Sequence, residues 1–118
     1  MRGSLADKER LGHILDAINS IESFTKDVSV DGFMQNYMLQ LAVIKLLENI
    51  GEASNKITNE LRSELNDIDW SVMIRSRNVL VHDYFKINLK VIWLTIQNDL
   101  PGLKERIENL YTSRFPES

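Results

Sequence analysis

The side chains best suited to chemistry lie together in residues 77–84, which read Arg-Asn-Val-Leu-Val-His-Asp-Tyr. Arg77 offers a planar fork of hydrogen-bond donors that matches the oxygens of a phosphate group. His82 carries an imidazole that takes or gives a proton near neutral pH, and Asn78 and Tyr84 add an amide and a phenol. This combination suits phosphoryl chemistry on a substrate that supplies its own nucleophile, as RNA does with its 2′-hydroxyl.

The same residues also have a purely structural interpretation. Residues 75–90 hold four lysines or arginines and one acidic residue, Asp83. At the C-terminus of a helix, His82 and the arginines before it would offset the helix macrodipole, while Tyr84 and Phe85 would pack against the helix end. Residue types and spacing alone favour this structural interpretation over the chemical one.

Helical geometry limits how the motif side chains can act together. At about 3.6 residues per turn, Arg77 and His82 point roughly 140° apart in one straight helix. A symmetric dimer that places two such helices face to face would bring them together across its two-fold axis. It would also supply two imidazoles, one to act as a base and the other as an acid. The motif therefore predicts a homodimer with the site at the subunit interface.

Composition is typical of a single globular domain, which we expect to span residues 1–118. The absence of cysteine excludes disulfides, thiolate metal sites and a cysteine nucleophile. A net charge of −3 excludes a general nucleic-acid binder, so the basic stretch predicts a local anion site. No apolar run approaches the ~20 residues that cross a bilayer, and no signal sequence is recognisable. We therefore expect a cytoplasmic protein without a membrane segment.

Apolar residues recur every three or four positions, which predicts helices rather than strands. The expected elements are a helix over 6–26, a long helix over 32–65 with Asp31 as its N-cap, a third helix from Asp69 to about 82–85, a fourth capped by Asn88, and a fifth after a break near Asp99. The predicted fold is all-α, an antiparallel bundle of four to five helices that dimerises through the motif-bearing helices.

The long second helix has two features of its own. Between residues 39 and 47 its apolar side chains point in nearly every direction, which predicts burial by the bundle or by a partner subunit. Beyond Gly51 the apolar stripe narrows, so that end should be more exposed. Gly51 costs about 1 kcal/mol relative to alanine inside a helix, which favours a close helix contact there. Glu52 either pairs with Arg75 or Arg77 and orients the motif helix, or is solvated.

Other candidate residues have simpler interpretations. His13 and Asp16 are one helical turn apart, a spacing that suits two metal ligands, but no third ligand is in sight. We therefore expect surface residues there and no metal site. Phe33, Trp70 and Trp93 lie on apolar stripes and are expected in the core rather than as platforms for stacking bases.

Three blocks of sequence resemble the HepT-like toxins of the HEPN superfamily. They are Ile50-Gly51-Glu52-Ala53, then Arg77 with four residues before His82 and one more before Tyr84, then Trp93 followed by Asn98-Asp99-Leu100-Pro101. The resemblance covers about the last two thirds of the chain. It implies a HEPN-like helical fold and a metal-independent endoribonuclease that needs no cofactor, takes RNA as its substrate and acts as a homodimer.

The resemblance also assigns roles by position. Arg77 would hold the scissile phosphate, His82 would transfer protons, and Asn78 would order the site, with Glu52 in support. Such type VII toxins are paired with a minimal nucleotidyltransferase antitoxin, which silences them by transferring AMP to the motif tyrosine, here Tyr84. The added adenylate would bring bulk and negative charge into a site built for a phosphate.

A non-catalytic HEPN interaction module is the alternative. The same helical surface would bind a nucleotide or a nucleotidyltransferase subunit, with Arg77 and His82 holding a phosphate and cleaving nothing. Cleavage of RNA in the absence of metal ions distinguishes the two hypotheses.

Overall fold

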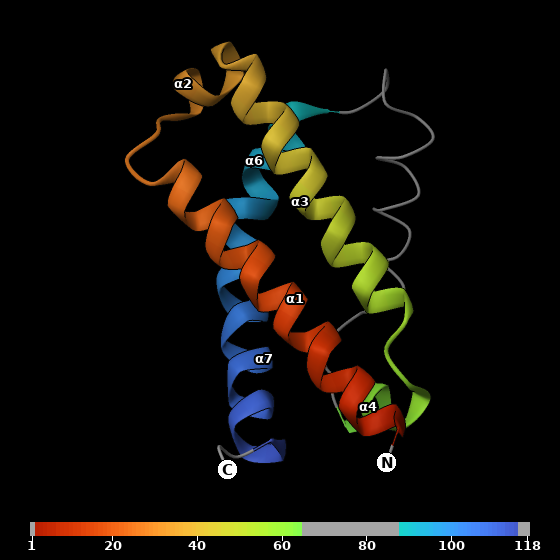
Figure 1. Ribbon diagram of the computed structural model, residues 1–118. Coiled ribbons are helices and arrows are strands. Elements are labelled where there is room, and N and C mark those ends of the chain that lie inside the picture. The colour runs from red at the N-terminus through yellow and green to blue at the C-terminus, as the bar shows by residue number, and fades with distance from the viewer. Residues whose placement is uncertain (1, 65–87, 116–118) are drawn as a thin grey trace.

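The computed structural model describes residues 2–64 and 88–115 (Figure 1). Its elements are α1 (Arg2–Thr25), α2 (Val30–Gln35), α3 (Tyr37–Asn55), α4 (Asn59–Glu64), α6 (Leu89–Leu94), the π-helical turn η2 (Thr95–Asp99) and α7 (Leu100–Arg114). These two ranges contain no strand, and the prediction of an all-α fold is confirmed. The helix predicted from Asp69 lies outside the described residues. Within the described ranges, no helix is both long and apolar enough to cross a membrane.

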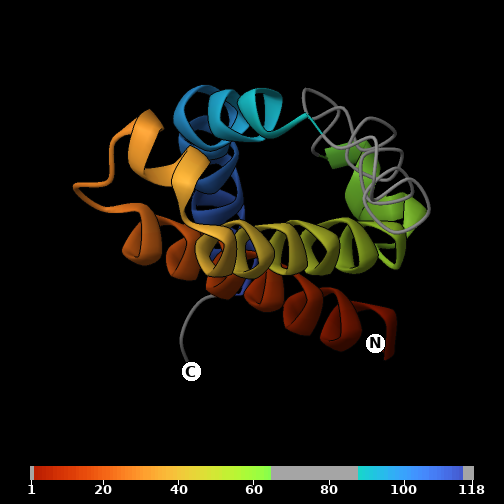
Figure 2. The same cartoon turned by 90° about the horizontal axis from the view of Figure 1, so that it is seen from above.

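Helix α1 contacts both α3 and α7. It runs from the lower right of Figure 1 to the upper left, whereas α3 and α7 both run downward, so α1 is antiparallel to each of them. Figure 2 shows α1 and α3 side by side, with α6 on the other side of α3 from α1. Helix α2 contacts both α3 and α6 and so joins these two parts.

The centre of the core comes from one stripe of α1. Leu11, Ile14, Ile18 and Ile21 follow one another at three- and four-residue spacing, and none has exposed surface. Burial of each such side chain contributes about 1.5–3 kcal/mol relative to exposure. The other elements add the buried residues Phe33, Val43, Ile44, Ile50, Leu61, Ile92, Ile96, Leu100 and Ile107.

The helix predicted over 32–65 is wrong as one element, because it breaks first at Asn36. Asn36 has extended backbone angles (φ −108°, ψ 93°), and its side-chain oxygen accepts a hydrogen bond from the Leu39 N–H at 3.0 Å. The buried amide of Gln40 then donates to the carbonyls of Phe33 and Met34 at the end of α2. Two amide side chains thus satisfy backbone groups that a continuous helix would have paired internally.

A second break separates α3 from α4. The Thr58 hydroxyl accepts from the Leu61 N–H and so caps α4. Asp7, buried in α1, accepts hydrogen bonds from the N–H and the hydroxyl of Thr58. Arg62 donates to the last carbonyls of α3, those of Ser54 and Asn55. Polar side chains therefore end one helix and begin the next.

The end beyond Gly51 is more exposed than the apolar middle, as predicted. Its apolar stripe (Ala53, Ile57 and Leu61) is buried, while the polar residues between are exposed (Asn55, Lys56, Asn59, Glu60, Ser63 and Glu64). The start of α1 contacts this end through the hydrogen bonds between Asp7 and Thr58. In the apolar middle of α3, Leu41 keeps 37% of its surface exposed.

The remaining helix boundaries mostly follow the predicted signals. Ser29, not Asp31, caps α2, because the Ser29 hydroxyl accepts from the Gly32 N–H and Asp31 lies within the first turn. The predicted cap Asn88 is confirmed, since its side-chain oxygen accepts from the N–H groups of Lys90 and Val91. Near Asp99, where a break was predicted, the helix does not end but continues through the π-helical turn η2 into α7.

Pro101 explains the widened turn. It lies in the first turn of α7 and carries no backbone N–H. Its ring would clash with the carbonyl four residues earlier in a regular helix. The π-helical turn relieves this crowding, and the Leu100 N–H bonds to the carbonyl of Thr95, five residues back.

Candidate functional site

One of the five predicted site residues, Glu52, lies in the part of the chain that the structure describes. Arg77, Asn78, His82 and Tyr84 fall in residues 65–87, outside the described residues. Their convergence across a dimer therefore stays a prediction.

The helices that border residues 65–87 are both attached to the bundle. On one side, Glu64 at the end of α4 forms an ion pair with Arg114 at the end of α7. On the other side, Asn88 caps α6, and Trp93 of α6 packs against the buried Phe33 with ring centroids 5.2 Å apart. The predicted core position of Phe33 is confirmed, and Trp93 is partly buried against the same core, whereas Trp70 lies outside the described residues. The motif segment thus starts and ends at fixed points of the fold.

Glu52 lies on α3 with 45% of its side chain exposed. The ammonium of Lys56, one turn later, is 3.9 Å from a Glu52 carboxylate oxygen. An ion pair this exposed contributes little to stability, so it does little to keep Lys56 from contacting a ligand. Arg75 and Arg77, the predicted partners of Glu52, lie outside the described residues.

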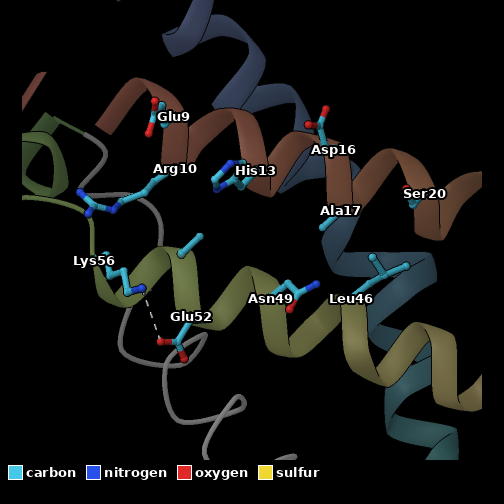
Figure 3. Close-up of a pocket in the computed structure, with 11 residues that line it drawn as sticks. Glu9, Arg10, His13, Asp16, Ala17, Ser20, Leu46, Asn49, Glu52 and Lys56 are labelled. Carbon is cyan, nitrogen blue, oxygen red and sulfur yellow. Dashed lines mark ion pairs between the residues drawn. The ribbon is translucent and has the colours of Figure 1, made fainter. Parts of the chain in front are cut away.

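Glu52 lines a groove of about 550 Å³ between α1 and α3 (Figure 3). The α1 wall includes Arg10 and His13, and the α3 wall includes Asn49 and Lys56. Its volume is within the ~300–1,000 Å³ that is usual for sites of small molecules. The groove is therefore the candidate binding surface within the described ranges.

His13 and Asp16 both line this groove and are both exposed. Within residues 2–64 and 88–115, no three His, Asp or Glu side chains gather where they could hold a metal ion. The polar lining of the groove combines two cations (Arg10 and Lys56), the amide of Asn49 and the imidazole of His13 with three carboxylates (Glu9, Asp16 and Glu52). The cations and the amide can bind an anion or a polar ring where the carboxylates point away from the groove.

The groove was missed at the sequence level, although its two walls leave a periodic signal. Positions 10, 13, 17 and 20 line it from α1, and positions 46, 49, 53 and 56 line it from α3. Each set has the three- and four-residue spacing of one helix face. Each set mixes charged or polar residues with small or apolar ones, so neither set is recognisable as an apolar core stripe.

Comparison with known proteins gives one family and several close relatives. The model of the family described as "Ribonuclease HepT-like" matches residues 14–110. The chain is 40% identical over 103 residues to "Probable ribonuclease HepT" of Thermococcus cleftensis, covering 87% of this chain and 94% of that protein. It is 39% identical over 101 residues to "Putative RNase MJ1380" of Methanocaldococcus jannaschii, covering 86% and 93%.

A third relative carries a second activity in its name. The chain is 40% identical over 97 residues to "Gamma-glutamylcyclotransferase and putative RNase MJ0434" of the same archaeon, covering 82% of this chain and 44% of that longer protein. No solved structure matches significantly.

Proposed function

Because this chain belongs to the Ribonuclease HepT-like family, we propose that it is a metal-independent endoribonuclease. The observation that carries the proposal is that the family match over residues 14–110 contains the Arg77–His82 motif. The motif's residue types independently suit phosphoryl transfer from a substrate with its own hydroxyl nucleophile. The printed names of the relatives, which include RNase or ribonuclease, support the same class of reaction.

The proposed reaction begins with attack of an RNA 2′-hydroxyl oxygen on the adjacent phosphorus. One His82 imidazole accepts the 2′-hydroxyl proton as the new P–O bond forms. The bond from phosphorus to the 5′-oxygen then breaks, and that oxygen receives a proton from a second, protonated His82. The products are a 2′,3′-cyclic phosphate and a 5′-hydroxyl, so neither water nor a metal-bound hydroxide enters this step.

The other predicted residues support this step. Arg77 neutralises charge on the phosphate oxygens through its donor fork. Asn78 orders the site, and Glu52 supports it through the orientation of the motif helix. Because the reaction needs two imidazoles and each chain has one His82, the active form is a homodimer with the motif at its interface.

Cleavage of RNA by the purified protein in the presence of EDTA tests the proposal. We expect the wild-type protein to cut a mixed RNA pool and the Arg77→Ala variant to lose at least ~100-fold in rate. Lys45→Ala, which removes a cation that is 72% exposed on α3, is the matched control and should cut normally. If the folded wild-type dimer binds RNA but leaves it intact, the chain is a non-catalytic HEPN module instead.

We further propose that the ribonuclease is a toxin of a type VII pair, held inactive in the cytoplasm by a minimal nucleotidyltransferase antitoxin. Transfer of AMP from ATP to the Tyr84 hydroxyl would release pyrophosphate and place a charged adenylate in the phosphate site. Mass spectrometry after incubation with the partner and ATP should find AMP on Tyr84. The Tyr84→Phe variant should remain active and unmodified under the same conditions, and adenylation elsewhere with loss of activity would contradict the assignment.

A further inference from the structure

The geometry of the groove between α1 and α3 points to a subsite for one nucleotide of an RNA strand, built from residues outside the 77–84 motif. The assignment of RNA as its ligand rests on the proposed function. The groove itself is defined by described residues of two helices that pack along each other. Three features carry the assignment: a cationic end, a floor of small apolar side chains, and a polar group placed beside that floor.

Two cations mark one end of the groove. Arg10 reaches across from α1 toward the end of α3 that carries Lys56 (Figure 3). Arg10 has no ion pair with any residue in the described ranges, and the 3.9 Å contact of Lys56 with Glu52 is long. A phosphate group placed here would meet a guanidinium fork and an ammonium from two different helices.

The floor beyond this end has little side-chain bulk. Ala17 and Ala53 line it and are both buried, and Leu46 closes it further along. Small apolar side chains leave room for a flat ring, whose faces lose contact with water when it enters. Asn49 is exposed on the α3 wall beside this floor. Its amide can both donate to and accept from the edge of a base, and adenine is the base whose donor and acceptor it matches.

The three carboxylates that line the groove bear on the orientation of the ligand. In Figure 3, Glu9 and Asp16 project from the side of α1 that faces away from α3, whereas Arg10 extends toward α3. Glu52 lies at the Lys56 end, but it projects from the side of α3 that faces away from α1 and pairs with Lys56. Asp16 lies near the Leu46 end, where it would repel a phosphate. A nucleotide therefore fits with its phosphate at Arg10 and Lys56 and its base between Asn49 and Ala17.

Binding of a fluorescent six-residue oligoadenylate by the His82→Ala protein tests the subsite without cleavage. In that background, we expect Arg10→Ala and Asn49→Ala each to raise the Kd about tenfold. Lys8→Ala and Asn19→Ala remove the same kinds of group from exposed positions of α1 outside the groove, and we expect both to bind normally. Equal Kd values for the groove variants and their controls would overturn the subsite.

The salt dependence of oligoadenylate binding shows whether a variant has lost a phosphate contact or has simply lost its fold. The association constant for a single strand decreases with salt, and each phosphate contact contributes about −0.7 to the slope of its logarithm against log salt concentration. Removing one contact therefore makes the slope shallower by about 0.7. Arg10→Ala should show that change, and Asn49→Ala should keep the wild-type slope while losing its preference for oligoadenylate over oligouridylate. An unchanged slope in Arg10→Ala would contradict the placement of the phosphate.

A free nucleotide carries the same phosphate and base as a nucleotide of RNA and is the other ligand that the groove could bind. Titration with AMP distinguishes the two ligands. We expect AMP to bind at least tenfold more weakly than the oligonucleotide, because a strand makes additional contacts. Binding of AMP as tight as that of the strand, and lost in Arg10→Ala, would make the groove a free-nucleotide site and overturn its assignment to RNA. If the groove variants fail to bind while wild-type protein cuts no RNA, the proposed function fails and the subsite stands. If wild-type protein cuts RNA and the groove variants bind oligoadenylate normally, the proposed function stands and the subsite fails.

Discussion

At the scale of single residues, the proposed mechanism assigns substrate binding and proton transfer to different side chains of the motif. His82→Ala removes the proposed acid and base and leaves the cations in place, so the rate constant of cleavage should fall by about 10² to 10⁴ while the Kd for RNA changes little. Arg77→Lys keeps the charge and loses the planar fork, so it should weaken both binding and rate. Single-turnover kinetics with separately measured Kd values check both expectations. An equal loss of binding in the two variants would show that His82 acts in binding rather than in proton transfer.

A second prediction concerns the ion pair that ties α1 to α7. The Lys104 ammonium donates to Glu22 at 2.7 Å, and this hydrogen bond raises the pKa of Lys104 above its usual 10.5 against an opposing effect of desolvation. The bond therefore stabilises the fold fully below pH ~10.5, and its contribution disappears as the pH rises through the raised pKa.

Melting temperatures across alkaline pH test this expectation. Glu22→Gln should melt slightly below the wild type at pH ~9, with a gap that is small because both side chains are partly exposed. That gap should close as the pH rises above the raised pKa. Glu9→Gln, which neutralises an exposed carboxylate on the same helix, is the control. A gap that widens with pH would contradict the assigned direction of the pKa change.

At the scale of elements, the packing of α1 against the start of α4 depends on Asp7. Its buried carboxylate accepts from both the N–H and the hydroxyl of Thr58. Asp7→Ala leaves these donors without their partner and should lower the free energy of unfolding by about 1.5–3 kcal/mol. Asp16→Ala, an exposed change on the same helix, should cost less than ~0.5 kcal/mol. Urea unfolding of the two variants compares them, and equal stabilities would show that the Asp7 link is not stabilising.

The same bonds explain which helix boundaries the sequence predicts. Apolar spacing predicted the helical content and the core stripe of α1, and residue type predicted the cap at Asn88, because each depends on neighbours within one or two turns. The breaks at Asn36 and Thr58 interrupt a stripe whose apolar residues stay in phase on both sides. The break at Thr58 depends on Asp7, 51 residues away, and no local pattern contains such a partner. The break at Asn36 has a local signal that the apolar spacing hid, because Asn36 caps Leu39 and Gln40 bonds to carbonyls within two turns.

The candidate site divides in a similar way. Residue types drew attention to residues 77–84 but favoured a structural interpretation, and the resemblance to the HepT-like toxins supplied the catalytic one. The roles of Arg77 and His82 stay a prediction, because both lie outside the described residues. The groove depends on two helix faces that meet only in the folded chain, so Arg10 and Asn49 had no visible connection in the sequence. His13 and Asp16, a suggestive pair one turn apart, are now explained as residues of that groove.

At the scale of the whole molecule, the mechanism requires two chains. Each chain supplies one His82, and the proposed reaction uses two. Light scattering at micromolar concentration should therefore give a mass near twice the 13.7 kDa of the single chain. Mixing Arg77→Ala with His82→Ala subunits should leave cleavage low, because every mixed dimer still lacks one imidazole. A mass of one chain combined with full activity would contradict the two-imidazole mechanism.

The most direct test of the central claim is the chemistry of the cut ends. We predict that wild-type protein in EDTA produces fragments with 2′,3′-cyclic phosphate and 5′-hydroxyl ends, which mass spectrometry identifies. A single 2′-deoxy substitution at the mapped position should abolish that cut and leave other cuts in the same strand unchanged. Continued cleavage at the deoxy position, or fragments with 5′-phosphate ends, would show that RNA does not supply the nucleophile and would contradict the proposed role of His82.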